Sequence, residues 1–447
     1  MSIKPNKLRS ALILCLLLLN LMLFAQIRII SPYSRFGVGD LSDNGNAWNL
    51  SMGQLGIGLR SPMHVNYANP ASYSAFDSLS FVFEGGLSGE FVSLKSDFQT
   101  ANRNYASLGY LLFGMPINKW WKTSIGLVPF SDVGYSVVNY EEYPNSGTVA
   151  RLYEGSGGIS RLFWGNSFRL AKNFSVGLNI SYLFGSMDRE AVILFPDSAY
   201  AMNFREAFHV TMNDLHYNFG AQYTAKLKEN MSMTIGGVFS PSLSMSSQTD
   251  IFAPTFLITS AGVESPRDTL VNTEGYKGRI VIPMMAGGGI SFNKTDKWTV
   301  GADYKWQNWE KFKAFGQGDS LVNSWQFNIG GEIVPNIDNY NKYLARVHYR
   351  LGFLYGKTYL HLRGQDLNEY AITFGLGFPL RGMRTMLNIG AQYGVRGTTA
   401  QNLIRENYFK IVVGFSIYER WFVKRNFYYP LPPFFRQVHS RTHLYYD

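Results

Sequence analysis

The chain consists largely of segments in which apolar and polar side chains alternate, from about residue 79 to residue 420. In the last segment, Phe409, Ile411, Val413 and Phe415 alternate with Tyr408, Lys410, Gly414 and Ser416. Successive side chains of a β-strand point to opposite faces, so a period of two predicts strands. The same alternation recurs at 175–184, 298–306 and 387–395. Such a series predicts a closed antiparallel sheet and leaves open which face meets lipid and which meets water.

The composition favours a membrane barrel over a soluble protein. Aromatic residues make up 16% of the chain, charged residues another 16%, and there are 44 glycines. The mean hydropathy is near zero, as expected when strands average an apolar and a polar face. The alternative, a soluble β-protein with an aromatic core, would need a second sheet to cover so many apolar faces. Eight of the nine tryptophans also fall near predicted strand ends or late in strands, at the interfacial depth that amphipathic rings prefer.

The N-terminus has the organisation of a secretory signal peptide. Three basic residues precede an apolar run from Ala11 to Phe24, and Ala25-Gln26 offers a cleavage point. A retained anchor helix is the alternative, but the run is only about fourteen residues long. The single cysteine, Cys15, lies within this run, so the mature chain is expected to have no disulfide and no thiol chemistry. The formal charge of +10 is scattered along the chain, which argues against nucleic-acid binding.

Alternation and turn signals together predict fourteen strands. The expected spans are 79–94, 102–115, 120–138, 148–164, 173–186, 208–226, 230–246, 279–292, 297–312, 322–333, 344–355, 367–379, 384–396 and 408–421. Tight turns alternate with longer links, as in outer-membrane barrels with short periplasmic turns and long external loops. The longest link, 247–278, is expected to be an external loop with an apolar stretch that captures ligands or packs over the barrel mouth. This parity places both termini in the periplasm.

The predicted organisation has four parts. Residues 1–25 form the signal peptide, and residues 26–78 form an N-terminal piece rich in Gly, Ser and Asn. Residues 79–423 form the barrel. Residues 424–447 form a periplasmic tail rich in Pro, aromatic residues and Arg.

The N-terminal piece carries a family resemblance. It reads SPYSRFGVGDL from Ser31, SMGQLGIGL from Ser51 and YANPASYSAFDSLSF from Tyr67. The sequence Asn69-Pro70-Ala71, directly before the first strand, resembles the NPA motif of FadL-type outer-membrane transport proteins. Members of that family are barrels of fourteen antiparallel transmembrane strands with the N-terminal segment folded inside the lumen as a hatch. The resemblance implies this all-β fold, and a location in the outer membrane of a Gram-negative bacterium.

The resemblance also implies a function. Proteins of this family pass hydrophobic solutes, such as long-chain fatty acids, through a gap in the barrel wall and sideways into the membrane without energy input. In the third predicted strand, Pro129 interrupts the apolar run, and proline cannot donate a ladder hydrogen bond. A kink in the third strand forms the family's opening, so Pro129, Phe130, Ser131 and Asp132 are the expected lateral opening. The alternative is an ordinary proline near a barrel rim.

A ligand with a carboxylate head group would need a cation in the lumen. Arg346, His348 and Arg350 alternate with apolar residues on the predicted eleventh strand, so we expect them to share its inner face. Glu332 and Glu369 fall on the presumed inner faces of neighbouring strands. The three cationic residues are therefore candidates for ligand binding, and a charge network that stabilises the barrel is the alternative.

Enzymatic signals are absent from the sequence, and we expect no catalytic residues, no metal site and no cofactor. The expected partners are outer-membrane lipid and hydrophobic small molecules. An alternative function comes from FadL-like barrels that resemble the PorV component of type IX secretion and serve as protein-binding scaffolds or shuttles. The aromatic and basic tail would suit the docking of periplasmic or secretion-system proteins. A porin-like barrel without a specific ligand is a third reading.

Overall fold

The computed structural model describes residues 31–42, 45–144, 147–198, 200–259, 261–339, 341–380 and 385–420. The predicted signal peptide and the predicted tail lie outside the described residues, so neither prediction is tested. No helix among the described residues is long and apolar enough to cross a membrane.

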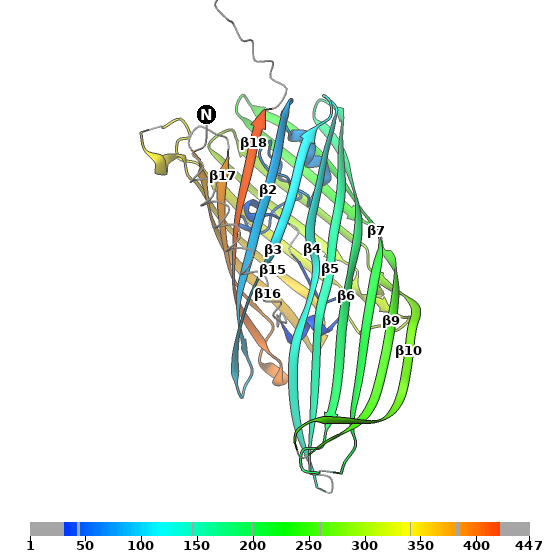
Figure 1. Cartoon of the computed structure of the whole chain (residues 1–447). Helices are drawn as coiled ribbons and strands as arrows, with labels where there is room; N and C mark the ends of the chain where they lie inside the picture. Colours follow the sequence, from blue (N-terminus) through cyan, green and yellow to red (C-terminus); the bar gives the residue numbers. More distant parts are fainter. Residues whose placement is uncertain are drawn as a thin grey trace, which may run out of the picture.

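The described residues form one closed antiparallel barrel (Figure 1). Its long strands are β2 (Ser80–Lys95), β3 (Thr100–Pro116), β4 (Trp121–Tyr143), β5 (Gly147–Ala171), β6 (Phe174–Leu194), β7 (Asn203–Lys228), β8 (Met231–Ser240), β9 (Leu243–Ile258), β10 (Glu264–Ile282), β11 (Met285–Lys294), β12 (Trp298–Gln307), β14 (Ser324–Ile333), β15 (His348–Leu362), β16 (Gln365–Pro379), β17 (Met386–Arg396) and β18 (Arg405–Arg420). Two short strands, β1 (Asp40–Leu41) and β13 (Lys313–Ala314), complete the sheet. The helical turns are η1 (Pro32–Arg35), α2 (Ala47–Leu50), η2 (Pro70–Ala75), η3 (Trp309–Lys311), η4 (Tyr343–Arg346) and η5 (Ala400–Asn402).

The prediction of a fourteen-stranded barrel with an N-terminal segment inside is confirmed. β8 and β9 are two parts of one spanning strand, as are β10 and β11, because β7 pairs with both β8 and β9. The barrel closes where β18 pairs with β2 from Arg405↔Lys95 to Arg420↔Ser80. We call the end of the barrel where β2 begins and β18 ends the proximal end, and the opposite end the distal end.

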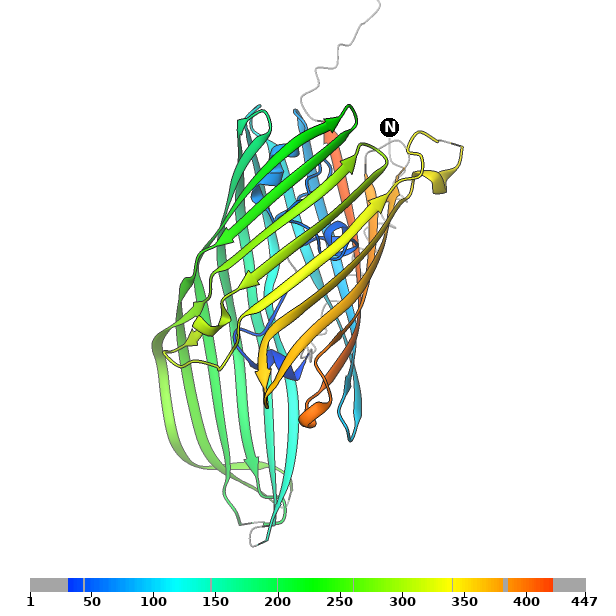
Figure 2. The same ribbon diagram turned by 180° about the vertical axis from the view of Figure 1, so that it is seen from behind.

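The predicted external loop at 247–278 is wrong. This stretch forms most of β9 and β10, which pair from Ile282↔Leu243 to Glu264↔Ile258. Together with the distal parts of β4 to β7 it forms a wall that extends beyond the rest of the barrel (Figures 1 and 2). The outer face of this wall carries polar residues such as Asp188 and His209, whose side chains lie 2.5 Å apart. Within 247–278, most of β10 is exposed on both faces, and three register shifts interrupt its ladder with β9. The period of two is therefore weak there, and the sequence reads as a loop.

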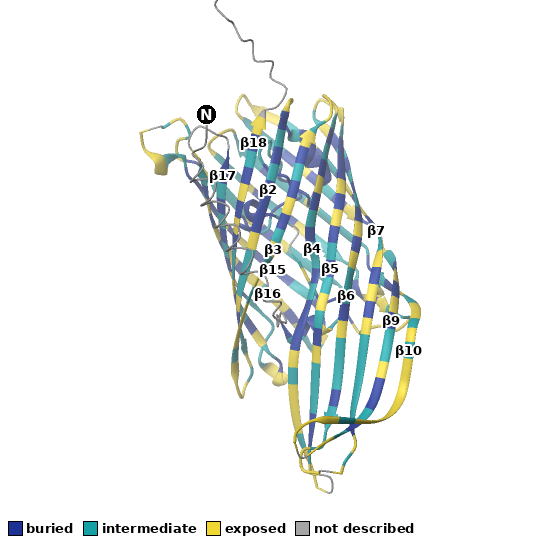
Figure 3. Cartoon of the chain, viewed as in Figure 1, coloured by how far each residue is buried: buried dark blue, intermediate teal, exposed yellow. Residues whose placement is uncertain are grey.

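Buried and exposed residues alternate along the strands (Figure 3). Along most of the barrel the exposed, outward side chains are apolar and the inward ones are polar. On β16, for example, Ile372 and Phe374 are exposed, whereas Thr373 between them is fully buried. The lumen is not empty, because the N-terminal residues and inward side chains fill it. One apolar cluster packs between residues 33–38 and the strands of the distal wall, and another surrounds residues 47–76.

We call residues 31–42 the edge segment and residues 45–78 the plug. The plug lies against inward-facing glycines on several strands, since a Cβ atom at these positions would lie between 2.1 and 2.4 Å from plug atoms. The glycines are Gly177, Gly220, Gly236, Gly330, Gly352 and Gly375. A Cβ atom essentially never approaches another heavy atom this closely, so each glycine gives the plug room that no other residue would leave.

Candidate functional site

The barrel wall is interrupted between β3 and β4. These strands pair only from Leu111↔Leu127 to Pro116↔Lys122, near the proximal end. β3 continues to pair with β2 as far as Thr100, and β4 continues to pair with β5 as far as Tyr143. Towards the distal end the two strands separate (Figure 1). The wall therefore has a gap between residues 100–110 of β3 and the distal part of β4.

The gap begins at a bulge in β4. The register of β4 against β5 shifts between Pro129 and Ser131, which leaves Phe130 as the extra residue. A bulge bends its strand, and Pro129 lacks the N–H that would continue a ladder with β3. Phe130 packs beside two inward side chains, with its ring 6.3 Å from that of His216 and 5.9 Å from the Arg161 guanidinium. Pro129, Phe130, Ser131 and Asp132 thus lie at the start of the gap.

The edge segment covers the edge of β4 that β3 leaves. Asp40 and Leu41 of β1 pair with Asp132 and Ser131 in antiparallel register. The Ser42 N–H donates to the Phe130 carbonyl at 3.0 Å, and the Ser31 N–H donates to the Gly134 carbonyl at 3.0 Å. β1 is thereby a short additional strand on the edge of β4, although the two segments are about 90 residues apart in the sequence.

Glycine is needed where the edge segment meets β4. Gly39 has a φ of +93°, and a Cβ atom there would lie 2.5 Å from the Asp132 carbonyl oxygen. A residue with a side chain would be strained in this conformation and would also collide with the β4 backbone.

The edge segment is also tied to β17 and β18 on the far side of the gap. Arg396 donates two hydrogen bonds to the Asp40 carboxylate, at 3.0 and 2.8 Å, and a third to Glu406 at 2.6 Å. Ser31 donates to the same Glu406. The Tyr33 hydroxyl donates to the Ile404 carbonyl at 2.6 Å, and burial raises the pKa of Tyr33 to about 12, which keeps this donor protonated. The edge segment is therefore held from both sides.

A cavity of about 160 Å³ lies behind the gap, and we call it the chamber. The edge segment lines one side with two residues of β4, Pro129 and Asp132, and residues of β2, β3, β16, β17 and β18 line the rest. Its charged lining residues are five carboxylates and two cations: Asp40, Glu90, Asp132, Glu369, Glu406, Arg396 and Lys410. A second cavity, of about 190 Å³, lies across the edge segment and is also lined by charged residues, including Lys305 and Lys357. The space next to the gap thus combines charged groups with apolar side chains such as Leu41, Val92 and Val412.

The predicted hatch motif begins η2 and lies against the glycines of the wall. The Asn69 side chain accepts a hydrogen bond from the Ala71 N–H at 3.1 Å and donates to the Ile57 carbonyl at 2.8 Å. Pro70 occupies the first helical turn, where its missing N–H is no loss. The motif thus makes hydrogen bonds within the plug and packs against glycines of β6, β7 and β8. Its contacts hold the plug in place.

Arg346, His348 and Arg350 do not form the expected row. Arg346 lies in η4, before the strand begins, because β15 starts only at His348. His348 and Arg350 do point inward, and both contact Glu332, at 3.1 and 2.6 Å. Arg350 also donates to the Asn388 side chain at 2.8 Å. This geometry favours the charge network, and ligand binding by the three residues stays a prediction.

Two buried carboxylates that hold the plug were missed by sequence reasoning. Asp303 on β12 accepts hydrogen bonds from the N–H groups of Gly56, Ile57 and Gly58, at 2.7, 2.8 and 3.2 Å. The sequence shows an acidic residue on the inner face of a strand and a Gly-Ile-Gly sequence in the plug. No pattern near either of them in the sequence indicates that the two make contact.

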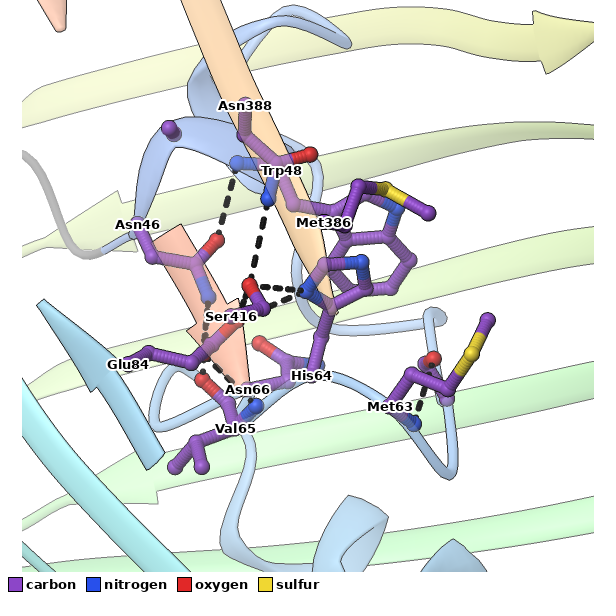
Figure 4. Close-up of polar contacts among 12 residues, drawn as sticks. Asn46, Trp48, Met63, His64, Val65, Asn66, Glu84, Met386, Asn388 and Ser416 are labelled. Carbon is purple, nitrogen blue, oxygen red and sulfur yellow. Dashed lines mark hydrogen bonds and ion pairs between the residues drawn. The ribbon is translucent and has the colours of Figure 1, made fainter. Parts of the chain in front are cut away.

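The second carboxylate is Glu84, which joins the plug to the seam between β2 and β18 (Figure 4). Its oxygens contact His64 Nδ1 at 2.7 Å and accept from Asn46 at 2.7 Å and from the Ser416 hydroxyl at 2.5 Å. His64 stacks on Trp48 with ring centroids 4.9 Å apart. This network attaches the plug to both strands that close the barrel. Among the described residues, no three His, Cys, Asp or Glu side chains gather as a metal site.

A fourteen-stranded barrel with its N-terminal residues in the lumen and a gap after the second strand is a FadL-like barrel. The chain itself belongs to the BamG family, whose model matches residues 7–428. The resemblance to FadL-type proteins is thus confirmed for the fold, and the family shown by the sequence is BamG. A comparison with curated proteins finds no match.

Several solved structures share the fold. The toluene transporter TodX of P. putida is 16% identical with a TM-score of 0.57, covering 85% of this chain and 99% of TodX. A FadL homologue of Pseudomonas aeruginosa is 14% identical with a TM-score of 0.57, covering 86% and 100%. The toluene transporter TbuX of Ralstonia pickettii is 13% identical with a TM-score of 0.55, covering 84% and 98%. At these identities the similarity shows the fold alone.

Proposed function

We propose that this chain is a protein-binding barrel of a Gram-negative outer membrane, and that a polypeptide partner binds at the gap between β3 and β4. The observation that carries the proposal is the charged lining of the chamber directly behind the gap. Polar and charged groups lining such a site are suited to a polypeptide backbone and polar side chains. A hydrophobic solute crossing the same space would place apolar atoms beside charged groups without offering them any hydrogen bond.

The fit of the plug supports the same proposal. A plug that had to move for each solute would break the three hydrogen bonds to Asp303 and the contacts around Glu84. It would also leave the glycine-lined wall against which its backbone lies. These contacts suit a permanent seal, which lets the gap serve as a binding site while the barrel stays closed. No catalytic step is involved.

The second candidate is the passage of hydrophobic solutes, such as long-chain fatty acids, with lateral release at Pro129–Asp132. The bulge in β4 and the gap beside it favour this function, because both lie in the third strand, where the FadL resemblance implies an opening. The named fold relatives include toluene transporters. In this case the edge segment would have to leave β4 before a solute could pass.

Mass spectrometry of the full-length protein, extracted from its native membrane in mild detergent, separates the two functions. A stoichiometric protein partner without a retained apolar ligand is expected. A retained fatty acid or other apolar ligand that is lost on Pro129→Ala substitution, with no protein partner, would favour the solute channel instead.

The predicted tail offers a different docking site, which a truncation tests. A variant that ends at residue 423 should keep the partner if the gap binds it. Loss of the partner from this variant would move the binding site to residues 424–447 and away from the gap.

A further inference from the structure

The direction of the strands around the gap limits what can fill it. β3 and β1 are each antiparallel to β4, so β3 and β1 run parallel to each other. They therefore cannot continue the antiparallel ladder by pairing directly. One additional strand that runs in the direction of β4 would be antiparallel to both. We call the space between β1 and residues 100–110 of β3 the slot.

In the described part of the chain, no strand pairs with the β3 side of the slot. Residues 100–110 pair with β2 on one side, and their register pairs include none with β4. In an antiparallel strand, every second residue directs its N–H and C=O away from a given neighbour. Half of the backbone polar groups of this stretch therefore face the slot. Such an edge favours pairing with another strand, especially where lipid offers no hydrogen bonds.

The side chains around the slot indicate what kind of strand fits. On the outer surface near the start of the slot the neighbours are apolar, since Leu108 is 43% exposed and Leu87 on β2 is 52% exposed. Nearer the distal end, the outward residues Asn102 and Asn104 are exposed and polar. On the inner side lies the chamber, where carboxylates outnumber cations by five to two. Because side chains of a strand alternate between faces, one strand can satisfy both surroundings. Its outward residues would be apolar, and its inward residues would be polar or basic.

From this geometry we infer that the slot receives one extended peptide strand of a partner protein, antiparallel to both β1 and β3. Main-chain hydrogen bonds to β3 would supply affinity, and the alternation of apolar and basic side chains would supply specificity, as in other cases of strand addition. The strand would complete the barrel wall from β3 through the guest and β1 to β4. The inference rests on the proposed function, because it requires a polypeptide partner.

Photo-crosslinking in the native membrane tests the inference. A photoreactive amino acid is placed in the full-length protein at Ala106 or Ser107, neighbours on β3 whose side chains alternate between the outer surface and the chamber. Ser93 on β2, which pairs with Asn102 of β3, is the matched control. Both slot positions should crosslink to the same partner protein, at adjacent or alternate residues of one peptide, and the control should not.

A blocking variant provides the second arm. Ser107→Trp fills the chamber side of the slot and should reduce recovery of the partner at least ~10-fold, whereas Ser93→Trp should leave it unchanged. The folded barrel is verified by its faster migration in unheated SDS gels. Partner recovery that survives Ser107→Trp, together with absent crosslinks at both slot positions, overturns the inference and leaves the proposed function standing.

Other occupants give distinct results. Crosslinks to lipid alone, with no protein partner in the purified sample, would overturn both the inference and the proposed function. Crosslinks to a second copy of this chain would replace the partner by self-association and so contradict the inference as stated.

Discussion

The carbonyl oxygen of Ile57 in the plug lies against Gly236 of β8, so closely that a Cβ atom on residue 236 would stand 2.1 Å from it. The next residue, Gly237, faces the other way, and its nearest neighbour would be 4.0 Å from a Cβ atom. Two adjacent glycines of one strand thus differ completely in their surroundings. The inner one gives room to the plug.

This pair provides the first prediction. Gly236→Ala should weaken the plug's attachment by roughly 1–3 kcal/mol, the usual cost of overpacking a tight contact. Gly237→Ala should have little effect. Limited proteolysis of the plug in detergent measures the difference. Equal proteolysis rates in the two variants would mean that the plug does not depend on this contact.

The second prediction concerns Asp303. Asp303→Ala leaves three plug N–H groups without their acceptor, and an unsatisfied buried donor costs about 1–3 kcal/mol. Asp303→Asn retains one acceptor oxygen and should be less damaging. Hydrogen exchange at Gly56, Ile57 and Gly58 is the measurement, and Asp338→Ala in an exposed loop is the control. Unchanged protection in Asp303→Ala would contradict the role assigned to this carboxylate.

The third prediction separates the two interpretations of Arg350. Its guanidinium side chain is fully buried against Glu332, so Arg350→Met strands a carboxylate, at a cost of about 3–5 kcal/mol in thermal or denaturant unfolding. The double variant Arg350→Met with Glu332→Gln should recover part of that loss. Recovery of stability in the double variant would show that Arg350 and Glu332 form a structural ion pair. If the single variant unfolds like the parent but loses an acyl ligand, Arg350 is a ligand-binding residue.

The fourth prediction concerns the attachment of the edge segment. Arg396→Gln removes the bidentate contact with Asp40 and the contact with Glu406. We expect faster hydrogen exchange at Ser42 and Gly134, whose N–H groups bond across the contact with β4. Arg363→Gln, which loses only contacts with the Gln401 and Asn402 carbonyls, serves as the control. Equal exchange in both variants would show that Arg396 does not hold the segment.

The alternation of apolar and polar residues was sufficient to predict the strands. It was not sufficient to predict where each strand begins and ends or what packs against it. Every predicted strand has a counterpart, because alternation on two faces is a property of neighbouring residues. The same rule failed at 247–278, where β10 is largely exposed on both faces and register shifts interrupt its pairing with β9. It also placed Arg346 on a strand, although the chain forms η4 there and β15 begins two residues later.

The candidate site was predicted only in part. Pro129 marks the bulge because a residue without an N–H limits pairing wherever it stands in a strand. The pairing of Asp40 with Asp132 had no such signal, nor had the contacts of Glu84 and Asp303 with the plug. Each of these joins segments that are distant in the sequence, and side-chain type alone does not identify such partners.

By itself, the sequence predicted a barrel of fourteen strands, because the period of two and the turns are properties of neighbouring residues. Only the tertiary structure decided how far the gap beside Pro129 extends, what lies against the exposed edge of β4, and that charged residues line the space behind the gap. Those properties arise when the edge segment, β3, β4 and the closing strands come together, and their physical cause is the matching of backbone hydrogen bonds and charges across long sequence separations.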